Sequence, residues 1–292
     1  MTRLTPDTFR RYFDSVLGRD DEIVVVYSGI WTFGHQFGLP AADVPRMLIE
    51  QMLESIGPRR TLLLPAYTYA FTQTRRYSPR TTLPETGVLP QTCLRECACL
   101  RTKSALNSFL AMGPKSIELA RVLGSTLWGE GSLMAVFEQL HARIVVLGIP
   151  WKDACGFLHR IEEAALVPYR YHKTFNGSWI DGENSRQWAE TMYVRPLTCM
   201  PVFRWSLVDE RLREQHRVLS SAASVFIESA DAADIVAAGL EILADDPYAL
   251  LENAADLRQW VRDAKIAEIH ALRIQEPQAL EFHDRRPANS NR

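Results

Sequence analysis

Unbroken runs of β-branched and aliphatic residues, each about as long as one strand, constrain the fold of this chain most strongly. The clearest are residues 22–28 (EIVVVYS), 61–65 (TLLLP) and 142–149 (ARIVVLGI). Continuous apolar runs of this length are typical of strands that are covered on both faces. Amphipathic segments lie between and after them, such as residues 40–56 and 232–244. This alternation predicts an α/β fold with a mixed, largely parallel central sheet and helices on both faces.

Other segments add to this framework. Turn signals at Asn176-Gly177 and Asp181-Gly182, within residues 171–193, predict an added antiparallel hairpin. The polar residues 281–292 predict a flexible tail behind a single domain of residues 1–280. We also expect a helix that opens at Thr5-Pro6, helices over residues 87–100, 116–123, 133–140 and 207–214, a helix beyond Pro247, and strands over residues 109–112 and 224–229.

The composition argues against several classes of function. A formal net charge of -2 and a pI near 6.4 give no basic footprint, so we expect no nucleic-acid partner. Because no signal-peptide pattern and no membrane-length apolar run occurs, we expect no membrane partner and a cytoplasmic location with reduced cysteines. Cys93, Cys97 and Cys99 lack the spacing of a zinc knuckle. We interpret them as three thiols on one helix, and expect no metal.

Two loops follow predicted strands, where ligand sites on α/β sheets collect. In the first, Tyr27-Ser28-Gly29, small residues let a ligand approach the backbone, although strand ends also use them for turn geometry. The second is the stretch from Arg101 to Ser108, which combines Arg101, Thr102, Lys103, Ser104 and Ser108. Two cations among hydroxyls suit a phosphate-bearing cofactor, but a solvated connecting loop has the same composition.

Two further segments surround predicted helix starts. Gly129-Glu130-Gly131-Ser132 precedes a helix, so its amides could bind an anion or a polarised carbonyl, or Ser132 could simply be an N-cap. Asp153 is expected to cap a helix on which His159 precedes Glu162 by three residues and Glu163 by four. This spacing puts an imidazole and a carboxylate on one face, as a general base requires. We expect the other histidines to lack a carboxylate partner of this kind, although chance alone also produces such pairs.

Taken in order, these segments resemble the aminoglycoside 3-N-acetyltransferase family. Members place a His-Ser-Ser loop after the first strand, a Pro-x-Tyr/Phe-Thr turn after the second, an Arg-Ser-x-His-Pro-x-x-Ser loop, a Gly-x-Gly-Ser turn and a Leu-His-x-x-Glu helix. The intervals agree over about residues 9–251. The matching stretches here are YSG at 27–29, PAYT at 65–68, RTKSALNS at 101–108, GEGS at 129–132 and LHRIE at 158–162. The carboxy-terminal half, with VPYRYHKTFNGSW, YVRPL and DPYALL, is more similar to relatives from polysaccharide and natural-product pathways.

The resemblance implies an N-acyltransferase that takes an acyl group from acetyl-CoA or another acyl-CoA to a small-molecule amine, in a monomer or homodimer. His159 would be the general base, held by Glu162. Tyr27, Tyr67 and Glu163 would contact the acceptor, and the helix-terminal amides of the Gly-x-Gly-Ser turn would stabilise the oxyanion. The residues expected along coenzyme A are Ser28, Gly29, Arg101, Thr102, Ser108, Gly131 and Ser132.

The chain departs from the family pattern in both donor loops. The His-Ser-Ser loop has become Tyr27-Ser28-Gly29, and His-Pro has become Ser104-Ala105. Three alternatives therefore stay open: a relative that binds a ligand without acyl transfer, a different biosynthetic reaction, and an acyl group carried first on Cys155, four residues before His159. For the acceptor, the aromatic and basic side chains favour a carboxylate or phosphate; these are Tyr169, Arg170, Tyr171, Lys173, Trp179, Arg195 and Arg204.

Overall fold

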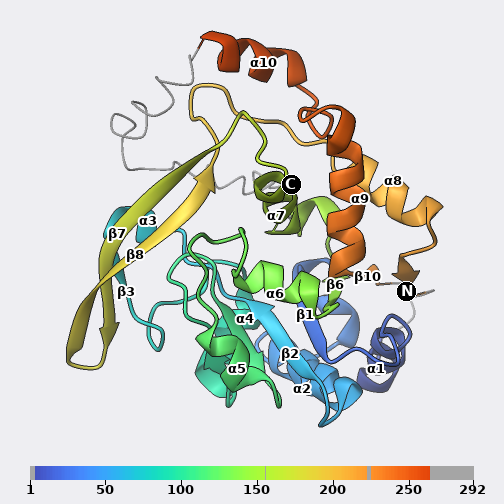
Figure 1. The fold of residues 1–292 in the computed structure, drawn as a ribbon. Coiled ribbons are helices and arrows are strands. Elements are labelled where there is room, and N and C mark those ends of the chain that lie inside the picture. Colours follow the sequence, from blue (N-terminus) through green and yellow to red (C-terminus); the bar gives the residue numbers. More distant parts are fainter. Residues whose placement is uncertain (1–3, 155, 222–224, 264–292) are drawn as a thin grey trace, which may run out of the picture.

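A seven-stranded sheet lies at the centre of the computed structural model, which describes residues 4–154, 156–221 and 225–263 (Figure 1). Its strand order is β4-β5-β2-β1-β6-β10-β9. The strands are β1 (Ile23–Ser28), β2 (Thr61–Pro65), β4 (Leu100–Arg101), β5 (Phe109–Met112), β6 (Arg143–Leu147), β9 (Leu219–Ser220) and β10 (Ile227–Asp231). The three apolar runs of the sequence are therefore the three central strands, as expected for strands buried on both faces.

The sheet is mixed, which confirms the predicted fold class. Strand β1 pairs in parallel with β2 and β6. On either side the direction reverses, because β5 pairs antiparallel with β2, and β10 pairs antiparallel with β6. The parallel part is thus confined to the three central strands, and their carboxyl ends meet at one edge of the sheet.

Helices cover both faces, as predicted, and β1 shows why. Val24 and Val26 belong to one buried cluster, whereas Ile23 and Val25 belong to the other, as the alternation of side chains along a strand requires. The first face is covered by α1 (Pro6–Asp14), α2 (Val44–Ile56) and α4 (Val88–Glu96), and the second by α6 (Leu133–Gln139), α7 (Gly156–Ala164), α8 (Ser206–Glu214) and α9 (Ala232–Asp245). The shorter or peripheral helices are α3 (Phe71–Thr74), α5 (Ser116–Arg121) and α10 (Ala254–Asp263).

A long hairpin extends from the sheet beside α7 (Figure 1). Strands β7 (Tyr171–Asp181) and β8 (Asn184–Val194) pair antiparallel over their whole length, and β3 (Arg76–Tyr77) adds to the edge of β7. The turn falls at Gly182, which has a φ of 63°, so the Asp181-Gly182 signal is confirmed. The Asn176-Gly177 signal is wrong as a turn. Gly177 lies inside β7, where a Cβ would meet the Phe71 ring at 2.7 Å.

Two predicted boundaries are also wrong. Helix α4 ends at Glu96 rather than residue 100, because the chain next forms β4, where Leu100 pairs with Ala111. Cys97 and Cys99 therefore do not share a helix with Cys93. The predicted strand at 224–229 is displaced to β10, whose last residue, Asp231, caps α9 by accepting a hydrogen bond from the amide of Ala233. The predicted tail at 281–292 lies outside the described residues.

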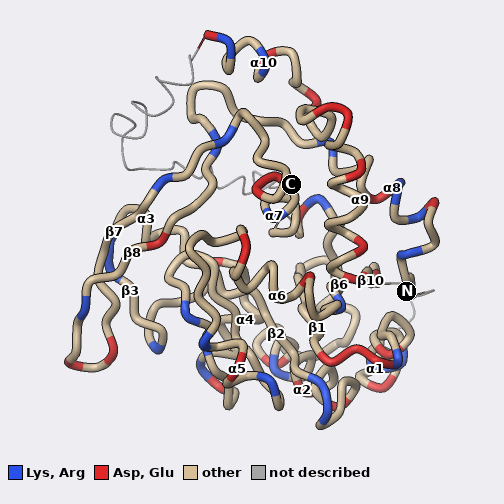
Figure 2. Tube along the Cα trace, in the orientation of Figure 1, with Lys and Arg blue, Asp and Glu red and all other residues tan. Residues whose placement is uncertain are grey.

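Positive and negative residues are both spread over the whole of the described chain (Figure 2). Within the described ranges, no helix is long and apolar enough to cross a membrane. Nor do His, Cys, Asp and Glu side chains there gather in a group of three that could hold a metal ion.

Candidate active site

The carboxyl edge of the parallel strands meets the start of α7. At this edge the hydroxyls of Tyr27, from β1, and Tyr67, just after β2, lie 3.0 Å apart, and both side chains are buried. Gly156, the first residue of α7, packs against the pair, since a Cβ there would lie 2.7 Å from the Tyr27 hydroxyl and 3.0 Å from that of Tyr67. The absence of a side chain therefore allows α7 to begin in contact with the two tyrosines.

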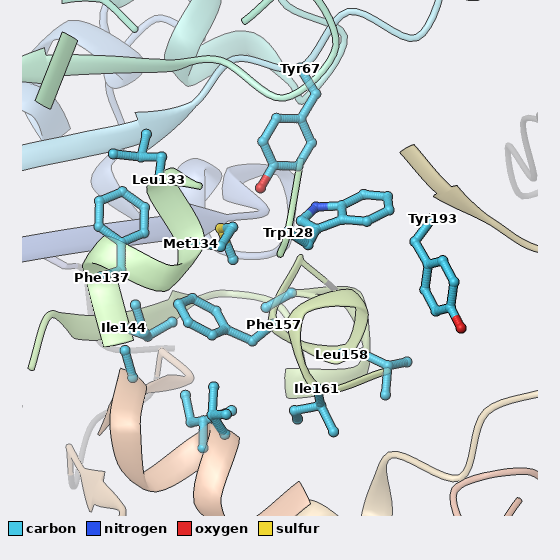
Figure 3. Packing of buried hydrophobic residues seen from close by; sticks show 14 of the residues in the cluster. Tyr67, Trp128, Leu133, Met134, Phe137, Ile144, Phe157, Leu158, Ile161 and Tyr193 are labelled. Carbon is cyan, nitrogen blue, oxygen red and sulfur yellow. The ribbon is translucent and has the colours of Figure 1, made fainter. Parts of the chain in front are cut away.

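Helix α7 is buried on its charged side as well as on its apolar side. Phe157 and Ile161 belong to the core, where they are drawn with Met134 and Ile144 (Figure 3). Its charged side chains, Arg160, Glu162 and Glu163, are buried too. Buried charges persist in folded proteins when they are paired and hydrogen-bonded. The contacts of these residues therefore define the site.

Arg160 connects α7 to the Gly129–Ser132 turn. Its guanidinium donates to Glu130 and to Glu138, each at 2.7 Å, and to the carbonyl of Trp128 at 3.2 Å. Gly129 lies so close that a Cβ there would be 2.9 Å from Oε1 of Glu163. The third predicted segment and the fourth thus form one assembly.

His159 lies within a buried hydrogen-bond network. Its Nδ1 is 3.1 Å from Oε2 of Glu162, and the same oxygen accepts from Arg170 at 2.8 Å. Arg170 also lies 3.3 Å from Nδ1, but it could donate to that nitrogen only if Nδ1 carried no proton. The ionised carboxylate of Glu162 can only accept and lies nearer, so we assign the Nδ1 proton to the bond with Glu162. This tautomer places the imidazole lone pair on Nε2, the nitrogen that can accept a proton.

Glu162 is ionised because its partners outweigh its burial. Complete burial by itself would raise the pKa of this carboxyl. The charge of Arg170 and the hydrogen bond from His159 together lower the pKa by more than burial raises it, so the pKa lies below its ordinary value of 4.5. The Trp128 ring packs against the imidazole of His159, with ring centres 4.5 Å apart and the planes tilted by 41°. The ring is thus held by a carboxylate and an aromatic surface, which is the arrangement of an oriented general base.

A second histidine–carboxylate pair lies beside the first. Nε2 of His172, on β7, is 2.9 Å from Oε1 of Glu163, and its ring packs at a tilt against that of Tyr193, with ring centres 4.7 Å apart. His141 is also paired, with Asp231 at 3.2 Å. The expectation that the other histidines lack a carboxylate partner is therefore wrong for His172 and His141. These pairs join residues that are distant in sequence, so no local spacing could have revealed them.

The second predicted loop is held by internal hydrogen bonds. Arg101 donates to the carbonyls of Ala66 and Thr82 and to the hydroxyls of Thr68 and Ser108. Burial lowers the pKa of its guanidinium. The buried Ser108 hydroxyl donates to Ala66, and the hydroxyl of Thr102, also buried, accepts from the amide of Phe109. Arg101 and Ser108 thus join the loop to Ala66, just after β2, and Thr102 joins it to the start of β5.

The altered Ser104-Ala105 segment has a partner that the sequence analysis missed. Glu190, buried on β8, accepts from the amides of Ala105 at 2.7 Å and Leu106 at 2.9 Å, and from the Ser104 hydroxyl at 3.2 Å. Burial raises the pKa of Glu190. A proline at position 105 has no amide proton, so the departure from His-Pro creates the bond from Ala105.

A small cleft of about 80 Å³ joins the second and third predicted loops. Lys103, Asn107 and the hydroxyls of Ser125 and Thr126 lie along it, together with Thr102 and Ser132. Lysine and hydroxyl donors suit phosphate oxygens. Larger hollows lie at the opposite edge of the sheet, around residues 19–22 and 55–60, away from α7.

The remaining predicted residues lie around these groups. Ser28 is half-buried at the end of β1, and a Cβ on Gly29 would meet Ile149 at 2.2 Å. The interpretation of Ser132 as an N-cap is confirmed, since its hydroxyl accepts from the amide of Ala135. Gly131 is exposed beside it, with a φ of 73°. Asp153 does not begin α7 but ends a short 3-10 turn over Trp151–Asp153, and Cys155 lies outside the described residues.

Comparison with known proteins identifies the fold and the family. The family model described as aminoglycoside 3-N-acetyltransferase matches residues 35–241. Among solved structures, the AAC-IIIb binary complex with CoASH has a TM-score of 0.70 at 18% identity, covering 83% of this chain and 97% of that one. The AAC(3)-IVa apoenzyme has a TM-score of 0.65 at 20% identity, covering 88% and 97%. AAC-VIa bound to sisomicin has a TM-score of 0.66 at 18% identity, covering 84% and 98%.

No curated protein matches the chain. The family match nevertheless spans well over half of it and includes the Gly129–Ser132 turn and the His159–Glu162 helix. The chain therefore belongs to the aminoglycoside 3-N-acetyltransferase family, whose members are CoA-dependent enzymes that acylate an amino group.

Proposed function

We propose that this protein moves an acetyl group from acetyl-CoA to an amine of a small polar acceptor, with His159 as the general base. The observation that carries the proposal is the buried network in which Glu162 accepts from both His159 and Arg170. A carboxylate that is kept ionised inside the protein stabilises the imidazolium that forms when His159 takes a proton. An amine acylation needs such a base, because an ammonium ion has no lone pair for attack.

In the proposed reaction, one proton passes from the amine to His159 and then to the leaving thiolate. Bound acetyl-CoA supplies a thioester carbonyl and a thiolate that leaves readily. Nε2 of His159 accepts the proton of the attacking amine, and the charge that develops on the ring is balanced by Glu162. As the nitrogen–carbon bond forms and the carbon–sulfur bond breaks, the same imidazolium can return the proton to the departing thiolate. Most of the rate gain then comes from positioning the amine and keeping it neutral.

The residues present fit a coenzyme A of this kind. Lys103 and the hydroxyls along the small cleft would hold its phosphates. Arg101, Thr102 and Ser108 would keep the loop that carries Lys103 in place, while Ser28, Gly29, Gly131 and Ser132 would border the pantetheine arm and the reacting carbonyl. Tyr27, Tyr67 and Glu163 would face the acceptor. A cytoplasmic location, a monomeric or homodimeric state and a biosynthetic substrate remain predictions.

The test is a His159→Ala variant assayed by thiol release from acetyl-CoA in the presence of a panel of amines. Loss of a positioned base should lower turnover by about 10²–10⁴-fold. The matched control is His141→Ala, which removes an exposed histidine that is likewise paired with a carboxylate but lies far from the site. It should leave turnover unchanged.

Calorimetric titration of acetyl-CoA completes the design. Both variants should bind acetyl-CoA as the parent does, since the base is assigned to chemistry rather than to donor binding. Turnover within a few-fold of the parent in His159→Ala would overturn the assignment of the base. A parent protein that binds no acetyl-CoA would instead favour a relative that has lost acyl transfer.

A further inference from the structure

Arg195 carries a charge for which the described part of the chain offers no acceptor. It follows β8 directly, at the base of the hairpin, and its side chain is half-buried. One of its terminal nitrogens, Nη1, is fully covered and makes no hydrogen bond to any of the described residues. Burial, and then the neighbouring positive charge of Arg170, lower the pKa of this guanidinium. The cation therefore has a covered donor and a like-charged neighbour.

Three other arginines around the site are compensated. Arg170 pairs with Glu162 at 2.8 Å, and Arg160 pairs with Glu130 and Glu138 at 2.7 Å each. Arg101 donates to the carbonyl of Ala66 and to the hydroxyl of Ser108. An unpaired guanidinium that is partly out of water is unfavourable to folding. Functional sites often contain residues that lower the stability of the free protein because they are needed to bind a ligand. An unpaired arginine fits this description when the ligand supplies the missing anion.

Arg195 is also connected to the His159 network, through the segment that anchors Arg170. Arg170, whose charge it feels, donates to the carbonyl of Tyr193 at 3.0 Å and to Glu162, the partner of His159. The carbonyl that Arg170 binds at the end of β8 thus lies only two residues before Arg195, and Arg170 is paired with Glu162, whereas Arg195 has no counterion among the described residues. An anion bound at Arg195 would therefore lie next to the segment that carries the Arg170–Glu162–His159 network.

We propose that Arg195 binds an anionic group, a carboxylate or a phosphate, on the same acceptor whose amine is acylated at His159. The inference rests on the proposed function and narrows it to amines that carry an anion. A guanidinium presents paired N–H donors to two oxygens of either group. Such an acceptor differs from a polycationic aminoglycoside, for which an uncompensated arginine near the base would be repulsive.

The test compares acceptors of similar length in the same thiol-release assay. The probes are γ-aminobutyrate, with a carboxylate, aminopropyl phosphate, with a phosphate, and putrescine and butylamine, with neither. The parent should acylate at least one anionic probe with a kcat/KM about 10- to 100-fold above the two others, the usual worth of hydrogen bonds to a charged group. The ratio between the two anionic probes then distinguishes carboxylate from phosphate.

Two variants assign the preference to the residue. Arg195→Met should remove the advantage of the anionic probes through a higher KM, with little change for butylamine, and Arg195→Lys should restore part of it. Arg204→Met is the matched control, because Arg204 lies nine residues further on and is exposed. Since Arg195 lacks an internal partner, Arg195→Met should melt no lower than the parent. This last readout separates a ligand-binding role from a structural one.

The outcomes separate the two proposals. If the parent acylates putrescine or butylamine as well as the anionic probes, and Arg195→Met behaves as the parent, the inference about Arg195 is wrong and the acyltransferase proposal stands. If neither these four probes nor an aminoglycoside assayed beside them is acylated, the acyltransferase proposal itself fails. If the aminoglycoside is acylated and neither anionic probe is, the inference about Arg195 is wrong. A fall in melting temperature for Arg195→Met without a change in acceptor preference would show a structural role and also overturn the inference.

Discussion

Replacing Arg170 by methionine should be among the most damaging single changes near the site, and the structure gives the reason. Glu162 is fully buried, and its Oε2 accepts from Arg170 at 2.8 Å and from His159 at 3.1 Å. Arg170→Met leaves that carboxylate without its main counter-charge. Breaking a buried pair on one side costs about 3–5 kcal/mol of the free energy of unfolding. For a chain of this size that corresponds to a melting temperature lower by roughly 6–12 °C.

Urea unfolding followed by circular dichroism measures this loss. The control is Arg46→Met. Arg46 meets Glu50 at a similar distance, 3.0 Å, but both side chains are more than half exposed, so its removal should cost far less stability than that of Arg170. The double variant Glu162→Gln/Arg170→Met contains no uncompensated buried charge, and should be more stable than Arg170→Met alone. A loss for Arg170→Met no larger than for Arg46→Met, or a double variant less stable than the single one, would refute the reasoning.

Two further predictions concern Glu162 and the altered loop. Because the pKa of Glu162 lies below its ordinary value of 4.5, the folded protein binds that proton less tightly than the unfolded chain. Its stabilising contribution is complete above about pH 4.5 and is lost as the pH falls through the folded pKa. Urea titrations at several pH values should therefore show a shallower acid loss of stability in Glu162→Gln than in the parent; equal slopes would contradict this. Ala105→Pro, which removes the amide bonded to Glu190 at 2.7 Å, should cost about 1–3 kcal/mol in the same assay, and an unchanged midpoint would speak against that anchor.

Much of the framework follows from local pattern. The run TLLLP is β2 with the predicted bounds, and residues 232–244 are α9 to within one residue. The His159–Glu162 pair also follows, because a helix places residues three apart on one face whatever surrounds it. The predicted ends of helices were less accurate where the next residues pair with a strand that is distant in sequence. Leu100 and Arg101 leave the predicted helix because β5 offers them hydrogen bonds that the sequence around them does not reveal.

The roles of the arginines depended on the tertiary structure. Arg101, Arg170 and Arg195 were all basic residues near candidate loops, and nothing in their neighbours along the chain distinguished them. Folding commits Arg101 to main-chain carbonyls and Arg170 to Glu162, and leaves Arg195 without an acceptor among the described residues. The sequence by itself determined which segments are strands and helices and where His159 meets Glu162, because hydrophobic periodicity and helical spacing act over a few residues. Only the tertiary structure decided which charges are paired, because a salt bridge depends on groups from distant segments meeting where water is excluded.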